Sequence, residues 1–214
     1  MSPLSLPETL LLLGFDANDA TTREGLSLSY AVAGAQLHEL ALAGRVTVEP
    51  ERVTLVDAKP TGDSQLDDLL ASIASTSDRP RKPRHWVMKR KSRAVPEYAQ
   101  RLVAARALSR RRARLLGIVP YTTLPVVDQA LRAQLLEEIG AALAAPAPPP
   151  ERAAALIALI SVAGGRGRLI GDPEQQQRAE RIAADDVVAS AVKRAVDAVR
   201  RRGGDGGGMG AAGG

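Results

Sequence analysis

The segment 27–43 restricts the fold of this chain more than any other stretch. Apolar side chains occupy nearly all of its positions rather than one stripe, among them Leu28, Val32, Leu37 and Leu40. A helix that is apolar all round is buried on every side, so we expect this helix at the centre of the domain. Gly44 follows directly, and glycine is the residue that most often ends a helix in a left-handed conformation.

A short β-hairpin is predicted directly after this helix. Residues 46–48 and 53–55 alternate apolar and polar side chains on either side of the turn segment 49–52. Alternation with a period of two is typical of strands that have one buried face. Because only a short turn separates the two strands, we expect them to pair with each other.

The composition favours helices over a sheet sandwich. Apolar residues make up 45% of the chain but aromatic residues only 2%, so leucine, valine, isoleucine and alanine must fill the core. Helical spacing of apolar residues recurs at 66–73, 102–108, 131–143, 151–163 and 182–199. We therefore predict a mostly α fold, in which residues 1–202 form a single helical domain around a central apolar helix bundle with short β-hairpins. Residues 203–214 are predicted to be a disordered, glycine-rich tail.

Residue types that carry most enzyme catalysis are scarce. The chain has no cysteine and only two histidines, His38 and His85, which excludes disulfides and leaves few ways to pair a nucleophile with a base. Asp63, Asp67 and Asp68 lie at the start of a predicted helix, where carboxylates are expected from the helix dipole alone. We predict no enzyme activity, no metal and no cofactor, and the lack of cysteine fits a reducing, cytoplasmic compartment.

Positive charge is concentrated in one part of the chain. Residues 79–114 carry 14 Lys/Arg against 1 Asp/Glu, whereas residues 1–78 carry 4 against 12. Such a density of like charge is either a solvated run or a contact surface for an anionic membrane or polymer. Because Pro80 and Pro83 fall among the arginines, residues 75–95 are predicted to be a basic linker or loop, and Pro96 is predicted to open the next helix.

An apolar segment, 115–125, follows this positive charge. Gly117, Pro120 and Pro125 interrupt it, which argues against a helix and for an extended hairpin-like pair of arms. An apolar loop beside a polybasic patch supplies the two signals that stable membrane attachment needs. In one alternative, the loop folds back on the core or pairs with a second subunit. In another, the chain is a winged-helix-like nucleic-acid-binding protein.

Short motifs occur in a fixed order along the chain. Residues 10–14 read Leu-Leu-Leu-Leu-Gly, residues 37–46 read Leu-His-Glu-Leu-Ala-Leu-Ala-Gly-Arg-Val, and residues 60–63 read Pro-Thr-Gly-Asp, with Leu-Asp-Asp at 66–68. With the segments 102–108 and 156–160, they resemble the Golgi phosphoprotein family of phosphoinositide-binding peripheral membrane proteins, over roughly residues 4–202. The abundance of Ala, Arg and Gly is typical of a GC-rich genome and indicates a bacterial member.

The resemblance implies a helical domain whose basic face holds a phosphatidylinositol 4-phosphate headgroup. It also implies an apolar hairpin that inserts into the bilayer or mediates self-association, and a role without enzyme activity. Eukaryotic members act as adaptors that retain glycosyltransferases at the Golgi. The expected partners are therefore an anionic lipid of the phosphatidylinositol 4-phosphate type, a client protein and a second copy of the chain, at a cytoplasmic, peripheral membrane location.

The family's headgroup positions fall, counted without gaps, on Glu24, Ala33, Ser92 and Val95. A small shift brings Arg90 and Arg93 to the last two positions, where an i, i+3 spacing on a helix would aim both at one phosphate. The predicted site residues are headgroup contacts from Lys89, Arg90, Lys91, Arg93 and Arg23, an inserting or self-associating hairpin from Ile118, Val119, Tyr121 and Leu124, and a nonspecific basic patch from Arg110, Arg111, Arg112 and Arg114.

Overall fold

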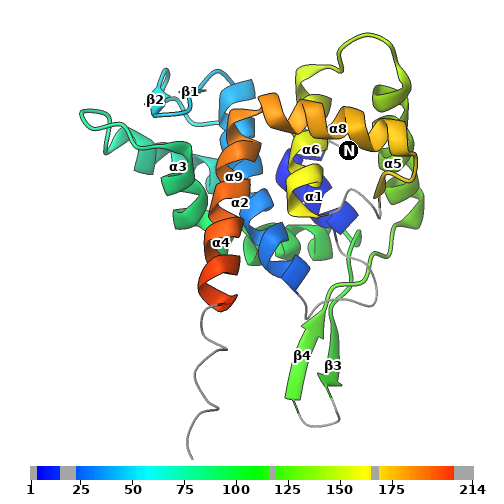
Figure 1. Ribbon diagram of the computed structural model, residues 1–214. Coiled ribbons are helices and arrows are strands. Elements are labelled where there is room, and N and C mark those ends of the chain that lie inside the picture. Colours follow the sequence, from blue (N-terminus) through cyan, green and yellow to red (C-terminus); the bar gives the residue numbers. More distant parts are fainter. Residues whose placement is uncertain (1–3, 15–22, 116–118, 165–168, 205–214) are drawn as a thin grey trace, which may run out of the picture.

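Helices make up most of the computed structural model, which describes residues 4–14, 23–115, 119–164 and 169–204 (Figure 1). The side chains of 23–26, 111–115, 119–123 and 202–204 lie outside this description. The elements are α1 (Leu6–Gly14), α2 (Arg23–Leu42), β1 (Val46–Val48), β2 (Val53–Leu55), α3 (Ser64–Ala74), α4 (Pro83–Ala104), β3 (Arg111–Leu115), β4 (Val119–Thr123), α5 (Gln129–Ala144), α6 (Glu151–Ala163), α8 (Pro173–Asp185) and α9 (Val187–Gly204). The predicted mostly α fold with short hairpins is confirmed.

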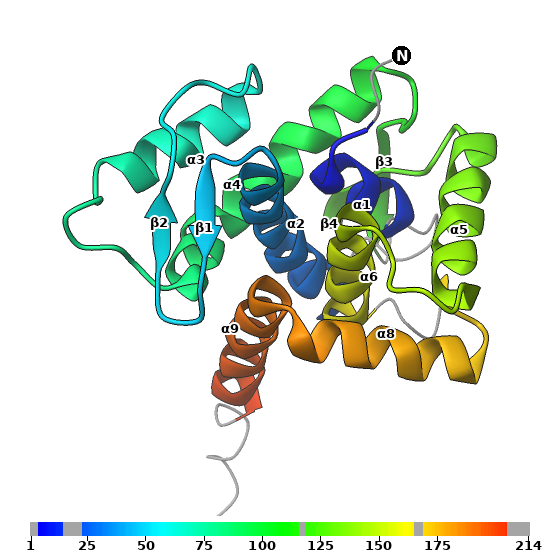
Figure 2. The same ribbon diagram turned by 90° about the horizontal axis from the view of Figure 1, so that it is seen from above.

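Helix α2 lies at the centre of the bundle. It packs against α1, α4, α6 and α9, and Figure 2 shows it surrounded by them. From Leu28 to Leu40 its side chains are buried except at Ser29, His38 and Glu39, which are partly buried. Apolar residues all round the helix therefore produce the central position that the sequence predicts.

Gly34 allows α2 to approach two other helices closely. A Cβ atom at this position would lie 2.7 Å from Val192 Cγ2 on α9 and 3.2 Å from Leu159 Cδ2 on α6. Real Cβ atoms do not approach other carbon atoms at 2.7 Å, so a larger residue would force the three helices apart. The missing side chain thus fixes the spacing at the middle of the bundle.

The ends of several helices follow local sequence signals. Gly44 and Gly164 have φ values of 65° and 87°, in the left-handed region where glycine carries no penalty. Asp63 caps α3 by accepting from the backbone N–H groups of Gln65 and Leu66, and Asp172 caps α8 by accepting from that of Gln175. Strands β1 and β2 pair antiparallel as predicted, with Val46 opposite Leu55.

Helix α4 corrects the prediction of a basic linker or loop over 75–95. Only residues 75–82 form a turn region, and a single helix runs from Pro83 to Ala104 with Pro96 inside it rather than at its start. The linker prediction was wrong because Pro83 occupies the first helical turn, where proline is well tolerated. Trp86, Arg90 and Ala94 then form a buried stripe at four-residue spacing, which anchors the helix to the core.

Strands β3 and β4 form an extended pair of arms, and the hairpin begins at Arg111, within the basic segment and before the predicted range 115–125. They pair antiparallel, from Arg111 opposite Thr123 to Leu115 opposite Val119, and they extend away from the helices (Figure 1). An isolated bridge between Leu108 and Val126 closes the base of the hairpin. In the predicted glycine-rich tail, residues 203 and 204 belong to α9, and residues 205–214 lie outside the described residues.

Candidate functional site

Two cations project from the exposed side of α4. Lys89 and Arg93 are exposed, and side chains four residues apart lie on the same helix face. The Lys89 Nζ lies 5.3 Å from the ring centroid of Trp86, an indole that is itself only 1% exposed. Arg93 makes neither an ion pair nor a hydrogen bond with any side chain that the structure describes. Both charges are therefore available to an external anion.

Lys91 lies at the boundary between α4 and α2. Its Nζ donates a hydrogen bond of 2.7 Å to the Tyr30 hydroxyl and lies 4.9 Å from the centroid of the same ring. The side chain is only partly exposed. Lys91 therefore already contributes to packing between the two helices, and it keeps only part of its charge accessible.

Arg90 is placed where it cannot contact a lipid headgroup, which corrects the prediction for this residue. The side chain is buried, with 5% of its surface exposed. Its Nε donates to Gln36 Oε1 at 3.0 Å, and its Nη2 donates to Gln65 Oε1 at 3.0 Å and to Glu97 Oε2 at 3.1 Å. The guanidinium thus joins α2, α3 and α4 inside the protein. Its charge is already satisfied there.

The Arg90 network continues to a buried phenol. The Gln36 amide nitrogen donates to the Tyr98 hydroxyl at 3.4 Å. Burial raises the pKa of Tyr98 well above its ordinary value, and the hydrogen bond with Gln36 opposes this only in part. Tyr98 therefore remains neutral and structural, and these groups act as a polar clamp rather than as reactive groups.

Three further positive or titratable groups lie at the start of α4 and were not predicted as site residues. Arg81, Arg84 and His85 are all exposed. Burial lowers the pKa of His85, and the charges of Arg81 and Lys89 lower it further. A four-residue spacing back from Lys89 points to His85 and Arg81, whereas Pro80 and Pro83 favour a loop over the same residues.

The hairpin residues divide into those that the structure places and those that it does not. For five of them the structure describes the backbone in β3 or β4 but not the side chain: Arg111, Arg112, Arg114, Val119 and Tyr121. Ile118 lies wholly outside the described residues. Arg110 is exposed at the start of the hairpin. Its charge therefore lies at the base of the β3–β4 hairpin.

Leu124 is the remaining predicted hairpin residue. Its side chain is partly buried and packs against the hydrophobic core, because it lies at the base of the hairpin rather than toward its end. Leu124 is therefore less accessible than a residue at the end of the hairpin would be.

Two of the predicted headgroup positions concern α2. Arg23 is the first residue of α2, and its side chain lies outside the described residues. Ala33 is buried in the core with 1% of its surface exposed. On α9, Arg200 donates to the Ser27 hydroxyl at 3.1 Å, which adds a cation beside α2. The C-terminal end of α9 and the β3–β4 hairpin both lie at the lower end of the molecule in Figure 1.

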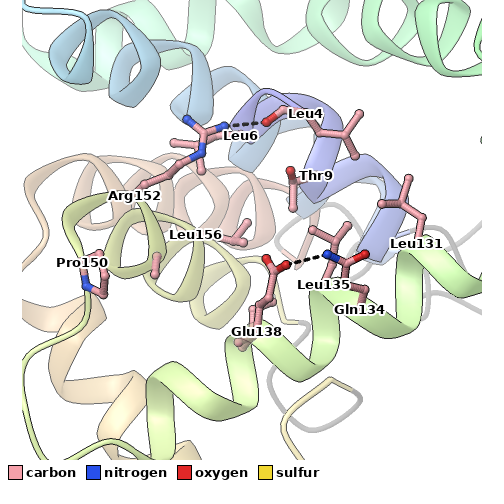
Figure 3. A pocket seen from close by; sticks show the side chains of 12 residues that line it. Leu4, Leu6, Thr9, Leu131, Gln134, Leu135, Glu138, Pro150, Arg152 and Leu156 are labelled. Carbon is pink, nitrogen blue, oxygen red and sulfur yellow. Dashed lines mark hydrogen bonds between the residues drawn. The ribbon is translucent and has the colours of Figure 1, made fainter. Parts of the chain in front are cut away.

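A separate pocket of about 410 Å³ lies between α1, α5 and α6 (Figure 3). Leu6, Leu131, Leu135 and Leu156 are among the apolar residues that line it. Arg152 at its edge donates to the backbone oxygen of Leu4 at 2.6 Å and forms an ion pair with Glu39. The residues lining this pocket are mostly apolar and include one carboxylate, that of Glu138.

Within the residues that the structure describes, no group of three His, Asp or Glu side chains is arranged to hold a metal ion. None of the helices that the structure describes is long and apolar enough to cross a bilayer.

A helical body, a hairpin that projects from it and an exposed cationic helix face define a class of helical domains that present a charged surface. The chain matches the family described as Golgi phosphoprotein 3 (GPP34) over residues 6–199, and it belongs to that family. This family binds phosphoinositide lipids, is associated with the Golgi and is not known as an enzyme family. No curated protein matches the chain.

Proposed function

We propose that this protein is a peripheral membrane-binding module of the cytoplasm that attaches to anionic, phosphoinositide-type headgroups. The observation that carries the proposal is the exposed face of α4, where Lys89 and Arg93 have no described acidic partner, in a chain that belongs to a phosphoinositide-binding family. Lys91 contributes the accessible part of its charge from the boundary with α2. Arg23 at the start of α2 remains part of this proposal.

Electrostatics support attachment through this face. Each Lys or Arg near an anionic leaflet contributes about 1 kcal/mol, so Lys89 and Arg93 together contribute enough to change a partition coefficient by more than a factor of ten. Interactions between exposed charges are screened beyond about 8 Å at physiological ionic strength. Binding through these side chains therefore weakens as salt is added.

The β3–β4 hairpin supplies the second signal in this proposal. Stable attachment generally requires two signals, and the hairpin extends away from the helices with its sequence rich in apolar residues (Figure 1). Ile118, Val119 and Tyr121 are the residues proposed to enter the bilayer or to contact a second copy. Arg110, Arg111, Arg112 and Arg114 are proposed to add nonspecific attraction at the headgroup level. An adaptor role toward a client protein belongs to the same proposal.

The winged-helix-like alternative is less well supported. Its recognition helix would have to be α2, since this helix precedes the β1–β2 hairpin, but α2 is buried at the centre of the bundle. At the tip of the hairpin, Glu49 pairs with Arg52 at 2.9 Å and Glu51 pairs with Lys82 at 2.5 Å. A buried helix and an acidic hairpin do not provide the surface that a nucleic acid groove requires.

Vesicle co-sedimentation tests the proposal. The protein is mixed with vesicles of phosphatidylcholine, of phosphatidylcholine with phosphatidylglycerol, and of phosphatidylcholine with phosphatidylinositol 4-phosphate, each at low and high salt. We expect retention by both anionic vesicles, loss of retention at high salt, and a partition coefficient about 30-fold lower for the double variant Lys89→Ala/Arg93→Ala. The double variant Lys59→Ala/Arg181→Ala serves as the control, because it also removes one Lys and one Arg, but from exposed positions outside α4.

Three results would contradict the proposal. Equal retention of the protein by neutral and anionic vesicles would exclude headgroup charge as the basis of binding. Failure to bind any vesicle, combined with retention of the protein by duplex DNA, would favour the nucleic-acid alternative. A larger loss in the Lys59→Ala/Arg181→Ala control than in the α4 variant would move the contact surface elsewhere.

A further inference from the structure

We propose that the anion-binding face of α4 extends to His85 and Arg81, and that His85 binds a proton when the face meets an anionic membrane, so that attachment strengthens as the pH falls. This inference rests on the proposed function, because it needs α4 to be the contact surface. It adds two contact residues and makes the affinity of the surface dependent on pH.

Helix geometry places these side chains in one row. His85, Lys89 and Arg93 are spaced four residues apart on α4, and all three are exposed. Arg81 precedes the helix by two residues, and its charge is one of those that lower the pKa of His85. Residues at i and i+4 are neighbours on a helix surface, so α4 presents two permanent charges and one imidazole to the same side.

Trp86 fixes two members of the row. The His85 ring meets the Trp86 ring edge-on, with centroids 5.0 Å apart and an interplanar angle of 87°. The Lys89 Nζ lies 5.3 Å from the same indole centroid. Because both groups rest on one buried ring, the imidazole and the ammonium are held near each other rather than free to separate.

The free protein disfavours a positive charge on His85. Burial lowers the pKa of His85 most, and the charges of Arg81 and then Lys89 lower it further. An anionic phosphate placed over the row would offset the repulsion from both cations and would interact directly with the imidazolium. The pKa of His85 is therefore higher in the bound state than in the free state.

The direction of the pH dependence follows from this difference. Between the free and bound pKa values the complex holds more protons than the free protein, so the affinity rises as the pH falls through that interval. Below the free pKa both states are protonated and the affinity becomes constant. An ordinary histidine titrates at about 6.5, which places the interval in the range accessible to vesicle assays.

Acidic groups on neighbouring elements are engaged elsewhere. On the β1–β2 hairpin, which packs beside Arg81 through the hydrogen bond from Val53 N to its carbonyl oxygen, Glu51 is paired with Lys82 at 2.5 Å. Arg194 of α9 also acts on Glu51, because its charge contributes to lowering the pKa of that carboxyl. The charges that act on His85 are thus the cations of its own row, and a membrane supplies the missing anion.

His38 provides a matched control, since it is the other histidine of the chain. Its Nε2 lies 3.1 Å from Asp186 Oδ1, and its side chain is 14% exposed. This ring lies between α2 and the start of α9 and already has an acidic partner. Replacing His38 removes a titratable imidazole without changing the α4 row.

The test measures co-sedimentation with phosphatidylcholine–phosphatidylglycerol vesicles at about pH 5.5 and about pH 8, a range over which phosphatidylglycerol keeps its charge. We expect the partition coefficient of the wild-type protein to be about fivefold higher at the lower pH, the effect of one added positive charge near an anionic leaflet. His85→Gln should remove this ratio, His38→Gln should keep it, and His85→Lys should bind at both pH values as tightly as the wild type does at the lower one.

The outcomes separate this inference from the proposed function. Binding that is equal at the two pH values, or a pH ratio that survives in His85→Gln, would overturn the role of His85 while leaving the membrane-binding proposal intact. A pH ratio lost in His38→Gln instead would assign the effect to the other histidine. Absence of binding to the anionic vesicles at both pH values would overturn both proposals together.

Discussion

Arg90→Met removes a buried guanidinium from the junction of α2, α3 and α4 and leaves an unbranched apolar side chain in its place. Three hydrogen bonds are lost with it, to Gln36, Gln65 and Glu97. This substitution decides whether Arg90 holds the fold together, as its burial indicates, or binds lipid, as its place in the basic segment suggested.

The magnitude follows from what the substitution leaves behind. Gln36 has 0% of its surface exposed, so its carbonyl oxygen loses a donor in a place that water does not reach. Removing one partner of a buried charge pair costs about 3–5 kcal/mol. The side chain of Glu97 is 28% exposed and recovers some hydration, which brings the expected loss to about 3 kcal/mol. For a chain of this size, this loss lowers Tm by about 6–12 °C.

Urea unfolding followed by circular dichroism measures this loss as a lower midpoint at an unchanged slope. Arg93→Met is the matched control, since it makes the same replacement three residues further along the same helix at an exposed position. We expect Arg93→Met to alter the free energy of unfolding by less than about 0.5 kcal/mol and to weaken vesicle retention. Arg90→Met should lower the free energy of unfolding and leave vesicle retention unchanged under conditions in which the variant is folded.

If Arg90→Met unfolded at the same urea concentration as the wild type, the structural role of Arg90 would be refuted. The same conclusion would follow if Arg90→Met kept its stability but lost vesicle retention to the extent seen in Arg93→Met. In either case the guanidinium would have to leave its three partners in solution, and the interpretation of α4 as having one buried and one exposed cationic side would fail.

Two further predictions concern stability. Gly34→Ala should lower the free energy of unfolding by about 1–3 kcal/mol through overpacking, since the new Cβ would lie 2.7 Å from Val192 Cγ2. Gly140→Ala on α5, where a Cβ meets no atom within 4 Å, should instead stabilise by up to about 1 kcal/mol; thermal unfolding of both variants checks this, and equal effects would contradict it. Hydrogen bonds from Thr61 lower the pKa of Asp67 in the folded state, so its contribution to stability is present above the unfolded pKa and is lost as the pH falls through the folded one. Asp67→Asn should therefore reduce stability at neutral pH and flatten its decline in acid, and an unchanged acid dependence in urea titrations would be inconsistent with this.

The fold was predictable wherever local sequence and tertiary environment agree. The apolar segment 27–43 could satisfy its side chains only at a central position, and α2 occupies that position. Gly44 and Asp63 act locally, through a left-handed backbone and a side-chain cap, so their effects do not depend on distant contacts. The alternating strands of the first hairpin needed only each other to pair.

Helix α4 and its site could be predicted only in part, because its structure depends on residues far away in the sequence. Prolines and arginines at its start favour a loop by local propensity, whereas burial of Trp86 against the core outweighs that preference. The i, i+3 pair Arg90 and Arg93 lies across the edge between the buried and exposed faces, so one side chain points inward and the other outward. Counting four residues from Trp86 would have indicated this for Arg90, but the polar partner Gln36 on α2 could not be found from spacing alone.

Trp86 is the only tryptophan of the chain, and it lies buried beneath Lys89 and beside His85. Its fluorescence therefore reports on the environment directly below His85 and Lys89. We expect a bound phosphate that draws Lys89 away from the indole, or a proton that binds His85, to alter the emission of this ring. The protein thus contains an intrinsic optical probe of its own contact surface, which requires no added label.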